Sequence, residues 1–139
     1  MDMPRSPTGF QERPHTADWA LEVWAPDPPT LLTQAALGMK ALMGVHTRSA
    51  PRVSQSFNLH FADLESLLIG FLSEVLYLLQ RDGISFDQFD LHITADQLHA
   101  TISGQPIDHL AKEIKAVTYH DLRVVQTERG LEVTIVFDV

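Results

Sequence analysis

Two long segments of the chain carry apolar residues at the spacing of an amphipathic helix. The first follows a proline-rich stretch, with Thr30 as a candidate N-cap, and ends at Gly44. The second begins after Asp63, a favourable N-cap, and ends near Gly83. The sequence therefore predicts helices over Thr30–Met43 and Asp63–Gln80. Their apolar stripes are Leu31, Leu32, Ala35, Ala36, Met39, Leu42 and Met43, then Leu64, Leu67, Leu68, Phe71, Leu72, Val75, Leu76 and Leu79.

The remaining regular segments alternate between apolar and polar residues, which is typical of half-buried strands. Gln105–Lys112 is too short and mixed for such a pattern, and we expect a loop with one helical turn there. The order of strand, helix, strand, helix and four further strands predicts an α+β fold. In its simplest form, a single mixed β-sheet is covered on one face by both helices. The expected strands lie within Phe10–Trp24, Arg52–Phe61, Phe86–Thr94, Gln97–Ser103, Glu113–Leu122 and Leu131–Phe137, with a turn at 127–130. We expect residues 1–9 to be a flexible tail and residues 10–139 to form one domain.

The segment Glu113–Leu122 is rich in β-branched and aromatic residues, which predicts a strand. Alternation would put Ile114, Ala116 and Thr118 on one face, and Lys115, Val117 and Tyr119 on the other. A lysine in such an apolar setting is costly unless its ammonium reaches water or an anion. Two interpretations of Lys115 stay open: a snorkelling surface lysine, or a contact to a charged group.

Composition narrows the classes of partner. The 139 residues include 18 acidic and 10 basic side chains, giving a net charge of -8. The basic residues form no cluster, which disfavours direct binding of RNA or DNA. A partner with a basic surface, or a cation, suits this charge better. The chain has no cysteine, and no apolar run long enough for a membrane span or a signal peptide. We therefore expect a cytoplasmic protein.

Acidic residues mark both ends of the chain. Asp18 precedes the first alternating segment, and Asp138 follows the last, one residue before the terminal carboxylate of Val139. If the first and last strands were neighbours, three carboxylates would converge into a site for a hard divalent cation such as Ca²⁺ or Mg²⁺. The alternative is that these acids simply face water at strand ends. The seven histidines show no zinc-ligand spacing; His92 and His99 could face each other across a hairpin.

Four motifs together resemble the archease family. They are His15-Thr16-Ala17-Asp18, the Asp63-Leu64-Glu65 helix start, Glu113-Ile-Lys-Ala-Val-Thr-Tyr-His and the terminal Phe137-Asp138-Val139. The resemblance covers residues 10–139 and implies a non-catalytic accessory protein of an RtcB-type RNA ligase in tRNA splicing or RNA repair. Such a protein promotes guanylylation and multiple turnover of the ligase, and meets RNA only through it.

The resemblance also implies a cofactor and site residues. A divalent cation, most often calcium with Mg²⁺ or Mn²⁺ as alternatives, would be held by Asp18, Asp138 and Val139. Lys115 and His15 would belong to the same charge and partner cluster, and Asp63 and Glu65 are further candidates from the second helix. Gly70 and Ser73 depart from the family, which tends to carry an acidic residue and an asparagine there. We expect this acidic end of the protein to approach the cationic active-site mouth of the ligase.

Two other functions stay open. A small metal-dependent hydrolase would use Asp18 and Asp138 as ligands, with His15 or His120 as the base. A chaperone-like module would need an exposed apolar surface, for which Trp24 and Tyr77 are candidates.

Overall fold

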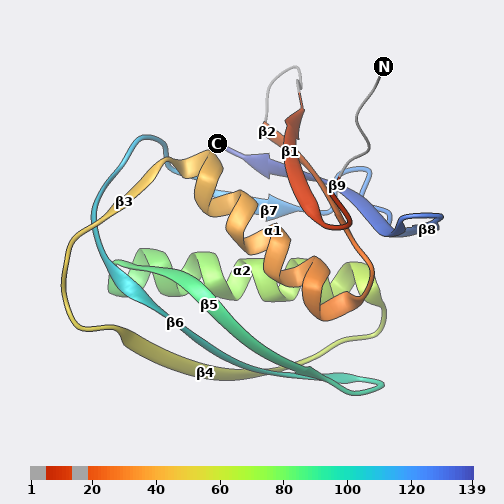
Figure 1. Ribbon diagram of the computed structural model, residues 1–139, viewed down its shortest axis with the longest axis horizontal. Coiled ribbons are helices and arrows are strands. Elements are labelled where there is room, and N and C mark those ends of the chain that lie inside the picture. Colours follow the sequence, from red (N-terminus) through yellow and green to blue (C-terminus); the bar gives the residue numbers. More distant parts are fainter. Residues whose placement is uncertain (1–5, 14–18) are drawn as a thin grey trace.

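The computed structural model describes residues 6–13 and 19–139, and the chain there forms two helices and nine strands (Figure 1). In chain order these are β1 (Gly9–Arg13), β2 (Trp19–Ala25), α1 (Pro28–Met43), β3 (Val45–Thr47), β4 (Val53–His60), α2 (Leu64–Asp82), β5 (Ile84–Ile93), β6 (Gln97–Leu110), β7 (Ala116–Thr118), β8 (Val125–Thr127) and β9 (Gly130–Asp138).

The strands form two antiparallel sheets. One has the order β1-β2-β9-β7, with β8 also paired to β9; the other has the order β3-β6-β4, with β5 also paired to β6. The α+β class is confirmed, whereas the prediction of one mixed sheet is wrong. Alternation shows which face of a strand is buried but does not identify the strand's partner.

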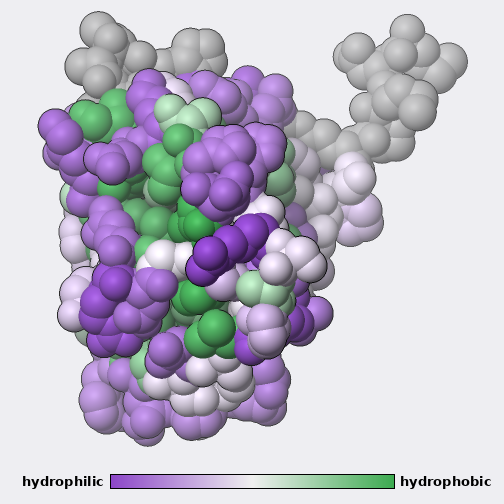
Figure 2. Space-filling view, turned by 90° about the vertical axis from the view of Figure 1, so that its left-hand side faces the viewer, coloured by the Kyte–Doolittle hydropathy of each residue, from purple (hydrophilic) through white to green (hydrophobic). Residues whose placement is uncertain are grey.

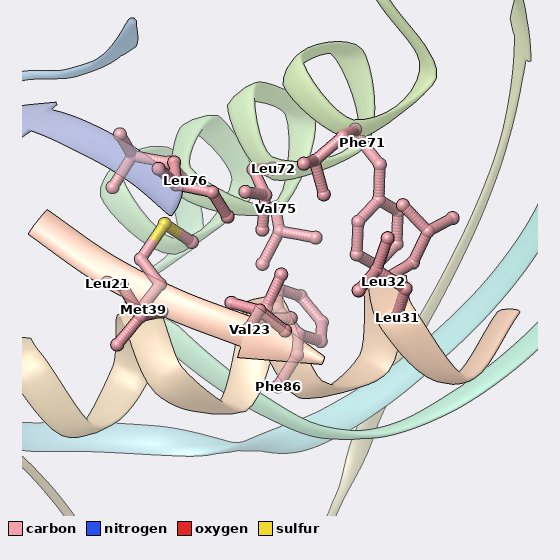
Figure 3. Close-up of a cluster of buried hydrophobic side chains, with 14 of the residues drawn as sticks. Leu21, Val23, Leu31, Leu32, Met39, Phe71, Leu72, Val75, Leu76 and Phe86 are labelled. Atoms are coloured by element: carbon pink, nitrogen blue, oxygen red, sulfur yellow. The ribbon is translucent and has the colours of Figure 1, made fainter. Parts of the chain in front are cut away.

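The helices lie between the two sheets and do not cover one face of a single sheet (Figure 1). Helix α1 packs on β1 and β2 of one sheet and on β5 of the other, and α2 packs on β7 as well as on β4 and β5. Both apolar stripes are therefore buried from two sides. Figure 3 shows Leu21 and Val23 of β2 meeting side chains from both helices and Phe86 of β5 in one continuous core.

Both helices begin and end at residues with a clear physical reason. Helix α1 begins at Pro28, because the side chain of Asp27 caps it by accepting a bond from the Thr30 amide at 2.9 Å. The prediction of Thr30 as the cap was wrong by one turn. Asp63 does cap α2, and Ser66 completes a reciprocal capping box. Gly44 and Gly83 end the two helices in the left-handed conformation.

Several segments differ from the sequence prediction. Strand β6 continues through Gln105–Leu110, where we expected a loop, because β3 pairs with its far end. The strand expected over Glu113–Leu122 is reduced to β7, Ala116–Thr118. The predicted tail overlaps β1 at Gly9, and residues 1–5 lie outside the described part of the chain. Neither α1 nor α2 is long and apolar enough to span a lipid bilayer.

Candidate functional site

The candidate site is built at the C-terminal end of β9, where two strands flank this last strand. On one side β7 pairs Ala116 with Asp138, and the Lys115 amide donates to the Asp138 carbonyl at 2.8 Å. On the other side β2 pairs Trp19 with Phe137. The first and last predicted strands are thus neighbours, and Lys115 and Asp138 lie side by side although 23 positions separate them in the sequence.

The structure describes two of the three predicted metal ligands. Asp18 lies outside the described residues, as does His15. Phe137 is fully buried, so strand alternation turns Asp138 outward, and its side chain is exposed. Val139 is half-buried and packs against the core. In the parts of the chain that the structure describes, no three His, Asp or Glu side chains come close enough together to hold a metal ion.

Lys115 does not follow the strand alternation expected for its segment. Ile114 is fully buried and Val117, three residues later, also packs against the core, whereas Lys115 and Ala116 are both exposed. The Gln80 side chain donates to the Ile114 carbonyl at 3.1 Å and holds this irregular backbone in place. The predicted face assignment for Ile114, Ala116 and Thr118 was therefore wrong. The lysine itself reaches solvent, so it incurs no cost of burial.

A second lysine, just before this segment, was not predicted as a site residue. The Lys112 ammonium lies 3.7 Å from the centroid of the Trp19 ring, a cation–π contact at the entrance of β2. Its backbone amide donates to the carbonyl of Met43 at the end of α1 at 3.1 Å. Lysine and tryptophan are 93 positions apart, so no local sequence signal could have paired them.

The two acidic candidates from α2 lie elsewhere and have structural partners. Asp63 caps the helix. Its carboxyl pKa is lowered mainly by the hydrogen bond from the Ser66 backbone and secondly by the hydrogen bond from the Ser66 side chain. Glu65 accepts a bond from the Val124 amide at 3.0 Å. Val124 immediately precedes β8, and β8 pairs with β9 between Gly130 and Glu132. Along β9, Glu132 is about 20 Å from Asp138. The structure does not bring these two acids to the Asp138 end.

The histidines form pairs on the surface. His92 and His99 are cross-strand partners on β5 and β6, as the sequence suggested; the first meets Asp90 at 3.2 Å and the second hydrogen-bonds Asn58. An unpredicted pair, His46 and His109, stacks with ring centroids 4.4 Å apart. These contacts account for four of the described histidines as paired surface residues.

Of the two aromatic side chains predicted to be exposed for protein binding, Trp24 is buried and Tyr77 is exposed. Trp24 is buried with 6% exposure, and its indole donates to the Ser6 carbonyl at 2.8 Å. Tyr77 is 51% exposed, with the Arg81 guanidinium 5.4 Å from its ring centroid. A single exposed tyrosine is ordinary for a protein surface.

Comparison with known proteins agrees with this architecture. The solution structure of a Methanobacterium thermoautotrophicum protein superposes with a TM-score of 0.71 at 22% identity, covering 94% of this chain and 99% of the other. The crystal structure of a Thermotoga maritima archease, described as a possible chaperone, gives a TM-score of 0.68 at 20% identity over the whole of this chain and 99% of the other. These two structures support the fold.

The sequence itself supports the family. Protein archease of Methanosarcina barkeri is 30% identical over 134 residues, which cover 90% of this chain and 92% of that protein. The profile of the archease protein family matches residues 10–139, from the second residue of β1 to the last residue of the chain. This span includes the strands that meet at Asp138, and the chain belongs to the archease family.

Proposed function

We propose that this protein is an accessory activator of an RtcB-type RNA ligase, and that it acts through the Asp138 end of β9. In this proposal it promotes guanylylation of the ligase and repeated turnover, and it contacts RNA only through the ligase. The ligase carries the reacting groups, and this chain supplies an acidic, cation-binding surface.

The observation that supports the proposal best is the strand order β2-β9-β7. Although these segments are far apart in sequence, this order brings the Lys115 segment and the end of β9 together, with Trp19 at the start of β2 beside them. Neither core packing nor strand pairing requires an exposed acid and an exposed lysine there. Within the described residues neither side chain has a hydrogen bond or an ion pair.

The donors present fit a hard divalent cation only in part. Asp138 offers an exposed carboxylate, which is the oxygen ligand that Ca²⁺ and Mg²⁺ prefer. A complete site needs further oxygens, for which Asp18 and Val139 remain the candidates. When bound, such a cation would neutralise charge on phosphate groups at the ligase. Lys115 would orient an anionic group beside it.

Opposite charge would favour the encounter with the ligase. The chain carries a net charge of -8, and acidic surfaces raise the rate of association with a basic active-site mouth. Binding could then favour the ligase conformation competent for guanylylation.

A chaperone-like role is the second candidate, because the Thermotoga maritima relative is described as a possible chaperone. It would depend on an exposed apolar surface and not on Asp138. The hydrolase alternative has less support, since no described histidine lies among the residues paired around Asp138.

The deciding experiment is a ligation assay with catalytic amounts of the cognate ligase. We expect no ligation by this protein alone and multiple-turnover ligation when it is added to the ligase. Asp138→Ala should abolish the stimulation, and Lys115→Ala should reduce it. Glu128→Ala is the matched control, because Glu128 is an exposed acid in the turn at the other end of β9.

Circular dichroism must show that each variant is folded. Full stimulation by a folded Asp138→Ala variant would exclude the proposed site. Equal protection of unrelated proteins from aggregation by wild type and Asp138→Ala, without ligase stimulation, would favour the chaperone-like role.

A further inference from the structure

Strands β4 and β5 are the two long borders of the sheet that contains β6, because both pair with the same part of β6 from opposite sides. A strand at the border of a sheet presents unpaired N–H and C=O groups to any further strand. Side chains are less informative here: Figure 2 shows the side of the molecule that lies at the left in Figure 1, and hydrophilic side chains interrupt its apolar surface. The backbone of the two border strands is therefore the better guide to a docking surface.

Strand β4, at the bottom of Figure 1, lacks the features that usually protect such a border. Its eight residues pair with β6 without a break in register, and none of them is Lys, Arg, Asp, Glu or Pro. Charged residues, prolines and bulges are the means by which proteins prevent unwanted strand pairing. By contrast, β5 carries Asp87 and Asp90 and has a register irregularity after Phe86. The β4 border is thus open to a further strand.

Every second residue of β4 turns its backbone polar groups away from β6. The Phe61 amide, directly after the strand, donates to the Asp96 carbonyl at 3.0 Å, so the odd-numbered residues bond to β6. The N–H and C=O groups of the even-numbered residues point outward, where no described residue forms a hydrogen bond with them. These four exposed residues are Ser54, Ser56, Asn58 and His60.

An aromatic side chain stands beside this border. Gly70 of α2 faces β4, since a Cβ on it would lie 3.4 Å from the Leu59 side chain. Tyr77 is two helical turns further along the same side of α2, and it is exposed. A strand added to β4 would therefore bring its inward side chains next to Tyr77.

The strand that fits this border is extended, with polar side chains outward and apolar side chains toward the helices. Strand β4 itself has this pattern, because Val53, Phe57 and Leu59 pack inward and the even-numbered residues are polar. About a twofold axis perpendicular to the sheet, two β4 strands pair antiparallel with their apolar sides on the same face. The second copy then brings its own α2 to cover the extended sheet, which a lone peptide does not.

We propose that this protein forms a homodimer in which β4 pairs with β4 of a second copy, so that the two sheets become one. The pairing does not depend on an RNA ligase, because β4 and Asp138 belong to different sheets. No like charges meet within β4, but each copy carries a net charge of -8. Dimerisation should therefore strengthen as added salt screens the repulsion between the copies.

Two substitutions at the centre of β4 test the pairing. Ser56→Pro removes an outward N–H and leaves the bonds to β6 in place, as prolines on border strands do. It should raise the Kd of the dimer at least about tenfold, because the twofold axis repeats the loss in both copies. Ser56→Ala is the matched control, since it loses the same hydroxyl contact to Thr101 but keeps the N–H. It should dimerise like wild type in sedimentation equilibrium.

Amide hydrogen exchange, followed by NMR on the wild-type protein, tests the same pairing without a substitution. The amides of Ser56 and Asn58 should exchange fast at low protein concentration and slowly at high concentration. Those of Gln55 and Phe57 should be protected at both, because they bond to β6. This measurement decides the matter if Ser56→Pro does not fold.

Three results would overturn the proposal. The first is a wild-type protein that stays monomeric at about 1 mM. The second is a folded Ser56→Pro that dimerises with wild-type affinity, which would place the interface elsewhere. The third is a dimer in which the Ser56 and Asn58 amides exchange as fast as in the monomer.

Discussion

Individual acidic residues of this chain have very different roles, which their sequence context does not reveal. Asp63 and Asp138 both stand at the boundary of an element, and both belong to motifs of the family resemblance. Asp63 is engaged in the capping box of α2, whereas Asp138 is exposed and, within the described residues, has no partner for its carboxylate. The helix cap therefore explains why an aspartate stands at Asp63, whereas the Asp138 carboxylate is accessible to a ligand.

The Asp63 cap should make a pH-dependent contribution to stability. Its folded-state pKa lies below the ordinary value for an aspartate, because hydrogen bonds from Ser66 favour the charged carboxylate. A lowered pKa stabilises the fold above the unfolded-state pKa, and the effect is lost as the pH falls through the folded value. Asp63→Ala should therefore lower Tm most at pH 5–7 and progressively less below about pH 3.8. Calorimetry across this pH range checks it.

Asp63→Asn is the control for the cap itself, because asparagine caps helices about as well as aspartate. It should retain most of the wild-type Tm at pH 7. A difference between wild type and Asp63→Ala that stays constant down to pH 2 would show that charge has no part in the cap.

At the scale of elements, β6 organises one sheet and a single glycine sets how closely its neighbours approach. Gly104 pairs with Val53 of β4 and with Phe86 of β5, where β5 has a register irregularity. A Cβ on Gly104 would lie 1.9 Å from the Ser85 carbonyl oxygen, a backbone atom that cannot move away alone. Glycine at this position is a packing requirement and not a sign of flexibility.

Two Gly→Ala substitutions should therefore have opposite effects. Gly104→Ala should destabilise the protein by about 1–3 kcal/mol, as overpacking does in well-packed regions. Gly70→Ala, within α2, places its Cβ 3.4 Å from the Leu59 side chain, which is ordinary contact. It should stabilise the protein by about 0.5–1 kcal/mol, because alanine favours helix. Urea unfolding of both variants checks the pair; a stabilised Gly104→Ala would contradict this account of β6.

At the scale of the whole molecule, the core joins both sheets into one unit. Phe71 of α2 is fully buried, with ring centroids 6.3 Å from Phe57 of β4 and 6.0 Å from Phe89 of β5. The same helix packs on β7 of the other sheet. Because both helices pack on both sheets, separating them from one sheet would also expose apolar surface on the other. Unfolding should therefore be cooperative.

Phe71→Ala should destabilise the protein by about 3–5 kcal/mol. Trp19 and Trp24 of β2 report on one sheet by fluorescence, and far-ultraviolet circular dichroism reports on the whole chain. Both signals should shift by the same amount in urea, because the core is shared. Separate midpoints for the two signals would show that the sheets unfold independently.

A divalent cation bound at the Asp138 end should stabilise the folded protein as a whole. A ligand that binds only the folded state stabilises it by about 2.7 kcal/mol at 100 times its Kd. Calcium should therefore raise the Tm of wild type and leave that of Asp138→Ala unchanged, while Glu128→Ala responds like wild type. An equal calcium response in wild type and Asp138→Ala would place any bound ion elsewhere.

The sequence alone determined those features that depend on neighbouring residues. The apolar stripes of α1 and α2, the Asp63 cap and the alternation of β4 each follow from local periodicity or local hydrogen bonding, and each is present in the structure. The family resemblance also came from local motifs, and the match over residues 10–139 bears it out.

Only the tertiary structure decided which segments are neighbours. The division into two sheets, the continuation of β6 through Leu110 and the burial of Trp24 depend on partners distant in sequence. The contact of Lys112 with Trp19 depends on such distant partners as well. Strand pairing and side-chain burial are energies of contact between distant residues, and a periodic pattern records only that a face is buried, not what buries it.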